Sequence, residues 1–247
     1  NIVTSAPPGM NWQASGLQVQ ASARVSSSEI RIGNQFFFRV ELPFVWSPEL
    51  IAGPLDPKSV KRGLDAFVAG APEVVPDEGV ARLLLPGFQP ERQHYVCRAA
   101  CGPMEEARQW ASQEFSSPGL NGQETFGWVE KLSGLGPGLT PSGDDVLGGM
   151  MIVLHRVGAV DSCQSLWRAV RRCAEETSNP ISYAHLAAAS EGTCGAGIHR
   201  AISSILCGDV DGVHVSFHDI DRVGQTSGWD TMTGVVAMLQ SWLAVRH

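Results

Sequence analysis

The pattern of hydrophobic and polar positions changes character along the chain. Between residues 17 and 42, apolar residues alternate with polar ones or cluster with β-branched and aromatic residues, in LQVQASARV, SEIRIG and QFFFRVEL. Such segments are typical of short strands, and the Ser-rich and Gly-Asn stretches between them are typical of turns. Residues 43–90 mix prolines with a predicted helix near VKRGLDAFVAG and one more predicted strand, ARLLLPG.

From about residue 91 onward, apolar positions recur at the spacing of helices. The predicted helices are MEEARQWASQEF, ETFGWVEKLSG, DDVLGGMMIVLHRVG, DSCQSLWRAVRRCAEET, ISYAHLAAAS, GIHRAISSILCG and TMTGVVAMLQSWLAVRH. Several open with a residue that caps helices well. The segment VHVSFHD instead favours a strand or a loop. We therefore predict an α+β protein, with a β-rich N-terminal domain over residues 1–90 and a helical domain over residues 91–247.

Composition and charge exclude some classes of function. The 247 residues are 43% hydrophobic, with a formal net charge of -7, which argues against nonspecific nucleic-acid binding because that requires a basic face. The apolar run at residues 146–154 is too short for a membrane span, and the N-terminus lacks the pattern of a targeting segment. We expect a cytoplasmic protein with no membrane partner. Since the chain begins without Met, we expect its natural start upstream.

Six cysteines are scattered through the chain, which favours reduced thiols over a disulfide framework in a protein of this size. Cys97 and Cys101 lie near His94, a spacing that zinc sites use. No second pair of ligands follows at a suitable distance. We therefore assign no residue as a metal ligand.

The stretch GLGPGLTPSGDD, residues 134–145, combines a glycine-rich loop with the start of a helix. Gly136 and Gly138 can take positive φ around a stiff proline. Either Ser142 caps the helix, with Asp145 in a capping box, or Thr140 caps it and proline takes the first helical position. In both cases we expect first-turn N–H groups to lie uncovered beside Gly143, as in an anion site.

Two adjacent carboxylates, Asp144 and Asp145, follow this loop. Acidic residues are common in first turns because they offset the helix dipole, so a purely structural role is one interpretation. Neighbouring helical positions point about 100° apart, however, and both side chains cannot cap the same helix. We therefore treat Asp144 and Asp145 as candidate catalytic residues. The candidate anion-binding residues of the loop are Gly136, Gly138, Thr140, Ser142 and Gly143.

A second helix start repeats this spacing. Ser227-Gly228-Trp229-Asp230 followed by Gly234 matches Ser142-Gly143-Asp144-Asp145 followed by Gly149 at a constant offset. In each, an Asp and a Gly four residues apart share one face, so another backbone can pack close to the glycine. We predict that the two N-termini converge on one charged ligand, although shared capping patterns would also produce such a match. This adds Asp230 as a candidate catalytic residue and Thr226, Ser227 and Gly228 as candidate binding residues.

Between the two helix starts lies TSNPISYAHLAAASEGTCGAGIHR. Ser178 or Asn179 before a proline predicts a helix start, and the alanines allow close helix packing. Ser182 joins the candidate anion-binding residues. His185, His199 and Arg200 are either polar contacts of the site or satisfied core and surface residues.

The blocks GLGPGLTPSGDDVLGGMM, NPIS with its Ala-rich helix, and VGQTSGWDTMTG resemble the AllH family, over about residues 120–240. The resemblance implies a subunit of the oxamate carbamoyltransferase of anaerobic allantoin and purine degradation, working with two further kinds of subunit. It implies carbamoyl transfer between oxalurate or oxamate and carbamoyl phosphate, all small anions. The Ser-x-Arg-Thr phosphate loop of classical carbamoyltransferases is absent from this sequence.

Two alternatives stay open. Thr140-Pro141-Ser142-Gly143-Asp144 also resembles the anion-hole loop of ribokinase-like sugar kinases, which would make Asp144 the base in phosphoryl transfer. Those kinases alternate strands with helices, an order that fits this chain poorly. The other alternative is a non-catalytic accessory or regulatory subunit. No cofactor is assigned, with Mg²⁺ left open because carboxylates are available.

Overall fold

The protein is described by a computed structural model, which covers residues 16, 21–34, 36–39, 54–117 and 126–246. The chain divides into two compact units, residues 1–49 and residues 50–247. The smaller unit holds a sheet and the larger one is helical, which confirms the predicted α+β class. The sequence pattern places residues 57–90 in the β-rich part, but they lie in the larger unit, because their apolar side chains are buried among its helices.

The smaller unit contains an antiparallel sheet in the order β1-β2-β3. The strands are β1 (Ala23–Val25), β2 (Glu29–Ile32) and β3 (Phe36–Arg39). Phe36 and Phe38 stack on one face, with 6.2 Å between ring centroids. Exposed Phe37, on the other face, lies beneath the guanidinium of Arg31. Segments 17–20, 35 and 40–42 of the predicted strands lie outside the described residues.

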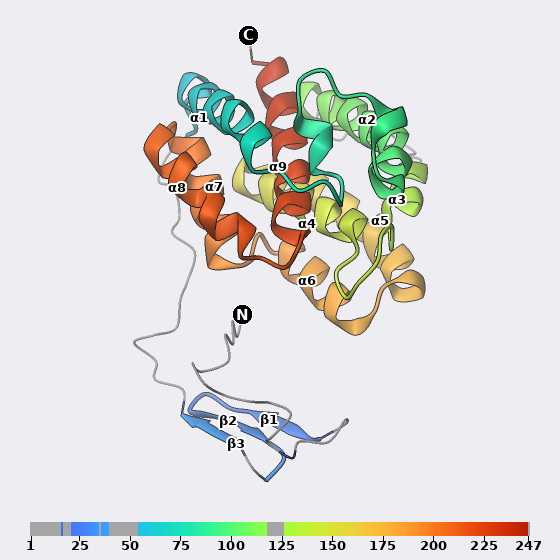
Figure 1. Cartoon of the computed structure of the whole chain (residues 1–247), viewed down its shortest axis with the longest axis vertical. Helices are drawn as coiled ribbons and strands as arrows, with labels where there is room; N and C mark the ends of the chain where they lie inside the picture. Colours follow the sequence, from blue (N-terminus) through green and yellow to red (C-terminus); the bar gives the residue numbers. More distant parts are fainter. Residues whose placement is uncertain (1–15, 17–20, 35, 40–53, 118–125, 247) are drawn as a thin grey trace. The chain divides into compact units, whose positions relative to one another are not determined.

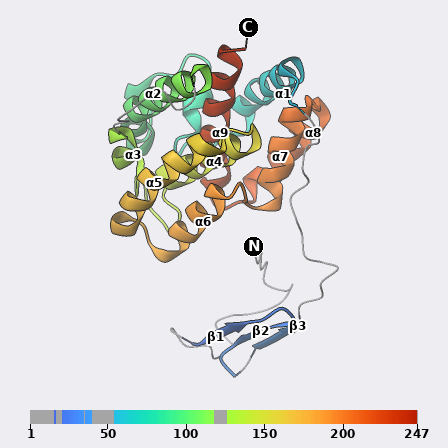
Figure 2. The same ribbon diagram turned by 180° about the vertical axis from the view of Figure 1, so that it is seen from behind.

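Helices α4 and α9 lie at the centre of the helical unit, and the other helices pack around them (Figure 1). Helices α1, α7 and α8 lie on one side of them, and α2, α3 and α5 on the other, an arrangement that the reverse view also shows (Figure 2). The helices are α1 (Pro57–Gly70), α2 (Tyr95–Ser116), α3 (Gly127–Leu132), α4 (Ser142–Arg156), α5 (Val160–Thr177), α6 (Pro180–Ser190), α7 (Ala196–Cys207), α8 (Val210–Asp221) and α9 (Ser227–Ala244), with short 3-10 helices η3 (Ala71–Glu73), η4 (Ala81–Leu84) and η5 (Pro90–Arg92).

The start of α6 shows how the sequence sets a helix boundary. The Asn179 side chain accepts hydrogen bonds from the backbone N–H groups of Ile181 and Ser182, and Pro180 takes the first helical position. Proline fits there because its missing N–H has no partner to lose. The predicted start at this residue pair is confirmed.

Helices α4 and α9 are buried almost all round, as expected of helices whose apolar residues are not confined to one stripe. They cross where each contributes a glycine. A Cβ atom at Gly149 would overlap the carbonyl oxygen of Thr231, and one at Gly234 would overlap that of Val146. The contacts are reciprocal, so the two sequence repeats pack against each other about a local two-fold relation. The predicted close approach of another backbone at these glycines is confirmed.

Two predicted elements are wrong. ARLLLPG forms η4 rather than a strand, because Ala81 and Leu84 turn the same way into the core while Val80 is held by a side chain of α9. VHVSFHD lies within α8, which Asp209 caps by accepting the N–H of Gly212. Its buried positions, Val213, Ser216 and Ile220, follow a helical spacing that the alternating valines concealed.

Within the described residues, no helix combines the length and the apolar character that a membrane crossing demands.

Candidate functional site

The loop before α4 depends on glycines at unusual backbone angles. Gly136 has φ 111° and Gly138 has φ 98°, values that other residues rarely adopt. A Cβ at Gly136 would stand 3.1 Å from the nitrogen of Ser142, whereas one at Gly138 would have no neighbour within 4 Å. The Gly138 side of the loop is exposed and open, while the Gly136 side packs against the helix start.

The predicted caps of α4 are wrong. Neither Thr140 nor Ser142 caps this helix; its N-cap residue is Pro141, whose carbonyl oxygen accepts the N–H of Asp145. The Thr140 hydroxyl instead lies 2.7 Å from the hydroxyl of Ser227, at the start of α9. Helix α9 likewise begins without a side-chain cap, after Thr226. The hydroxyls therefore join the two helix starts to each other.

Gly143 and Gly228 are packing residues. Their N–H groups donate to the carbonyl oxygens of Leu135 and Val223, each at 2.9 Å. A Cβ at either glycine would overlap a backbone carbonyl of the preceding segment, Leu132 or Ile220. These two amides are occupied by the protein, which corrects the expectation that the N–H groups beside the glycines lie uncovered.

Asp144 is buried at 2% exposure and holds three groups. One oxygen accepts the N–H of Gly134 at 2.8 Å, and the other accepts the hydroxyls of Ser178 and Ser182, each at 2.6 Å. The carboxylate thus ties the glycine-rich loop to the start of α6. This places the candidate residue Ser182 against Asp144, and the geometry favours a structural role for both; the catalytic role of Asp144 stays a prediction.

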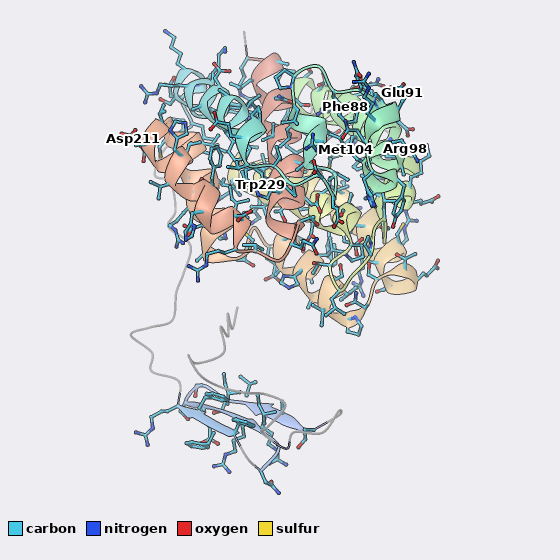
Figure 3. All side chains as sticks on the ribbon, in the orientation of Figure 1. Phe88, Glu91, Arg98, Met104, Asp211 and Trp229 are labelled. Carbon is cyan, nitrogen blue, oxygen red and sulfur yellow. The ribbon has the colours of Figure 1, made fainter. Side chains whose placement is uncertain are left out.

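The repeat position of Asp144 is occupied in α9 by Trp229, which lies inside the helical unit (Figure 3). Its ring contacts those of Phe67 and Phe217, with centroids 5.9 Å and 5.6 Å apart. The same position in the repeat therefore anchors one helix start by hydrogen bonds and the other by aromatic packing.

Asp145 and Asp230 are the equivalent carboxylates of the two repeats, each in the first turn of its helix. Burial raises the pKa of Asp145 well above its ordinary value, the nearby Ser227 and Thr140 hydroxyls oppose this shift, and the charge of Asp230 raises the pKa further. The 2.7 Å contact between the Thr140 and Ser227 hydroxyls holds the two helix starts together, which brings these carboxylates into one region. The two helix starts therefore meet, while their convergence on one charged ligand stays a prediction.

Asp230 is fully buried. Its Oδ1 accepts the N–H of Val80 at 2.7 Å, and burial raises its pKa while this N–H and the nearby hydroxyls of Ser142 and Thr226 oppose the shift. Residues 78–80 cover this carboxylate but are not among the candidates that the sequence indicates. Glu78 accepts a hydrogen bond from Gln225 beside the α9 start. No local motif marks this segment, because its role depends on a contact with a distant helix.

The remaining polar candidates lie elsewhere. His185 is exposed, and Arg200 pairs with Asp219 at 2.7 Å on the surface. His199 is buried at 2% exposure, where its Nε2 accepts the N–H of Cys194 and its Nδ1 lies 3.3 Å from the Arg156 guanidinium. These contacts make His199 a core residue apart from the helix starts.

His199 should make folding depend on pH. Burial, followed by the charge of Arg156, lowers its pKa from 6.5 to about 4. The unfolded chain therefore binds a proton first as pH falls, so the stabilisation present above pH 6.5 is lost between pH 6.5 and pH 4, by up to about 3 kcal/mol. Urea unfolding across this range measures it.

The matched variants are His199→Gln, whose amide oxygen can still accept the Cys194 N–H without titrating, and His218→Gln on the exposed face of α8. We expect the first to flatten the pH dependence and the second to leave it unchanged. An unaltered slope in His199→Gln would contradict the assignment.

Comparison with known proteins shows a similarity to a protein family. The profile of AllH, described as oxamate carbamoyltransferase subunit AllH, matches residues 132–239. The matched segment spans the glycine-rich loop and the starts of α4, α6 and α9. No solved structure matches the chain.

Proposed function

We propose that this chain is a subunit of an oxamate carbamoyltransferase-type enzyme, acting in purine and allantoin degradation together with other subunits. The family match carries this proposal, because residues 132–239 contain both helix starts and the glycine-rich loop whose Thr140 contacts Ser227. A family named for a subunit favours a hetero-oligomeric enzyme. The two helix starts also bring together a carboxylate, Asp145, and two hydroxyls, Thr140 and Ser227, which are groups that can hydrogen-bond a small amide.

The substrate is proposed to be carbamoyl phosphate, oxamate or oxalurate, each of which carries an amide group beside an anionic group. The partly buried side of Asp145 and the hydroxyls of Thr140 and Ser227 are suited to the amide end, because they can accept its N–H hydrogens. We assign the anionic end to the exposed backbone around Gly138, which has open space beside it. Two negative carboxylates would repel an anion placed directly between them.

Phosphoryl transfer by a ribokinase-like base has less support. Both oxygens of Asp144 are engaged in hydrogen bonds, so neither is directed toward a substrate hydroxyl. In the described residues, the strands form a small separate sheet instead of alternating with the helices. A non-catalytic accessory subunit differs from both enzymes in the ligands it binds, so binding experiments separate it from them.

Titration calorimetry of the full chain with carbamoyl phosphate, oxamate and ATP, each with and without Mg²⁺, tests the three functions. We expect binding of carbamoyl phosphate or oxamate and none of ATP. Mg²⁺-dependent ATP binding would favour the kinase, and absence of binding to all three would favour the accessory role.

The residue test is Asp145→Asn in the enzyme assembled with its candidate co-subunits. Loss of a charged hydrogen-bond acceptor for the amide should lower carbamoyl transfer by about tenfold or more, measured as oxalurate formed from oxamate and carbamoyl phosphate. Asp211→Asn, an exposed first-turn aspartate of α8, is the control and should retain full activity. Equal rates in both variants would exclude Asp145 from the site.

A further inference from the structure

The paired aspartates leave two buried oxygen atoms without a hydrogen-bond partner. Asp145 and Asp230 each stand four residues before the glycine at which α4 and α9 cross. The Oδ2 atom of each is buried and unpartnered. Since the Oδ1 atom of Asp230 already accepts the Val80 N–H, its Oδ2 atom is the one left over.

Their charge also lacks a counterpart. Among the ion pairs of the described residues, none involves either aspartate. Two ionised carboxylates, buried near each other without compensation, are strongly unfavourable, and natural structures neutralise such groups by a proton, a cationic side chain or a metal ion. The described part of the chain supplies no cationic side chain here.

We propose that the Oδ2 atoms of Asp145 and Asp230 bind one divalent cation of the Mg²⁺ class between the starts of α4 and α9. Mg²⁺ is held in proteins by one or two carboxylates and keeps several waters, so it needs no larger cluster of charged ligands. This accords with the described residues, in which no group of three or more His, Cys, Asp or Glu side chains forms a metal site.

The surrounding groups favour this cation over the alternatives. The hydroxyls of Thr140 and Ser227, 2.7 Å apart, lie beside Asp145 and can orient coordinated waters. These donors are all oxygen atoms, which suits Mg²⁺ or Mn²⁺ better than a softer metal ion. Asp145, Thr140 and Ser227 are only partly buried, so the hydrated side of the cation can reach solvent, whereas Asp230 holds it from inside.

A divalent cation here would also neutralise the two carboxylates, so that a small anion could bind beside them. The two carboxylates would bind a cation whether or not the chain takes part in carbamoyl transfer. The test of cation binding therefore uses the purified chain without substrate or co-subunits.

Mn²⁺ serves as the probe because its paramagnetic resonance signal disappears on binding. The full chain is stripped with a chelator, titrated with Mn²⁺ and then challenged with Mg²⁺, at constant ionic strength. We expect one Mn²⁺ per chain, displaced by Mg²⁺, and a melting temperature raised by about 4 °C or more in saturating Mg²⁺.

Asp145→Asn and Asp230→Asn should each weaken Mn²⁺ binding by about tenfold or more, since even indirect changes around metal sites have effects of this size. Asp211→Asn should bind as the unchanged chain does. If Asp230→Asn fails to fold by circular dichroism, Asp145→Asn decides the matter. Absence of bound Mn²⁺, equal binding by a folded Asp145→Asn chain, or stabilisation by acid alone with no response to Mg²⁺ would each overturn the proposal.

Discussion

Replacing Gly149 by alanine is expected to destabilise the helical unit by about 4 kcal/mol or more, lowering the melting temperature by roughly 10 °C. The added Cβ would overlap the carbonyl oxygen of Thr231, a backbone atom that cannot rotate away. Helices α4 and α9 would have to separate at the centre of the core. Thermal and urea unfolding measure the loss.

The neighbouring glycine provides a matched control. Gly148 lies in the same helix, and a Cβ there would meet only the Cβ of Ala189, at 3.6 Å, an ordinary contact. Gly148→Ala should therefore stabilise the protein by up to about 1 kcal/mol, through the better helix propensity of alanine. A loss of stability for Gly149→Ala beside a gain for Gly148→Ala would identify the helix crossing. Small changes of similar size in both variants would show that the two helices do not approach this closely.

The reciprocal variant tests the same crossing from the other helix. Gly234→Ala places its Cβ against the Val146 carbonyl and should cost about as much as Gly149→Ala. The double variant should cost less than the sum, because the first substitution already separates the helices and relieves the second clash.

The sequence contained enough information to find this crossing. Asp145 and Gly149 in one segment, and Asp230 and Gly234 in the other, share a spacing that puts each pair on one helix face. The pattern predicted both the close backbone contact and the convergence of the helix starts. Local spacing is enough to predict such a helix contact when both helices carry the same Asp-Gly pattern.

The hydrogen-bond partners of individual polar groups could not be predicted from local spacing. Local patterns predict that Thr140 or Ser142 caps α4, but the Thr140 hydroxyl meets Ser227 instead. The choice between Asp144 and Asp145 likewise depends on Ser178 and Ser182, which reach Asp144 only after α6 has packed against α4. Tertiary contacts decide which of several satisfactory local partners a polar group takes.

The segment around Val80 shows a second limit. Its N–H group covers Asp230 from 150 residues away in sequence, and its apolar neighbours suggest a strand when considered alone. The buried face of η4 satisfies the same hydrophobic pattern through a 3-10 turn. A short apolar run fixes burial but leaves the backbone conformation to its surroundings.

The second large effect is expected from Asp144→Ala, which should destabilise the protein by about 4 kcal/mol. The substitution removes the acceptor of three hydrogen bonds and leaves the N–H of Gly134 and the hydroxyls of Ser178 and Ser182 without it. Bonds to a buried charged group are among the stronger ones, and their donors cannot all reach water. Urea unfolding measures the total loss.

Graded variants separate this anchoring role from a chemical one. Asp144→Asn keeps an oxygen for the Gly134 N–H and can offer its amide hydrogens to the serine oxygens, so it should lose only about half as much stability. Ser182→Ala removes one bond and should cost about 1–2 kcal/mol. If Asp144→Asn abolished carbamoyl transfer while its unfolding curve matched that of the unchanged chain, Asp144 would be a catalytic group and not the anchor of the loop. Stability and activity falling together, in the order Ser182→Ala, Asp144→Asn, Asp144→Ala, would instead show that this carboxylate acts by holding the glycine-rich loop against α6.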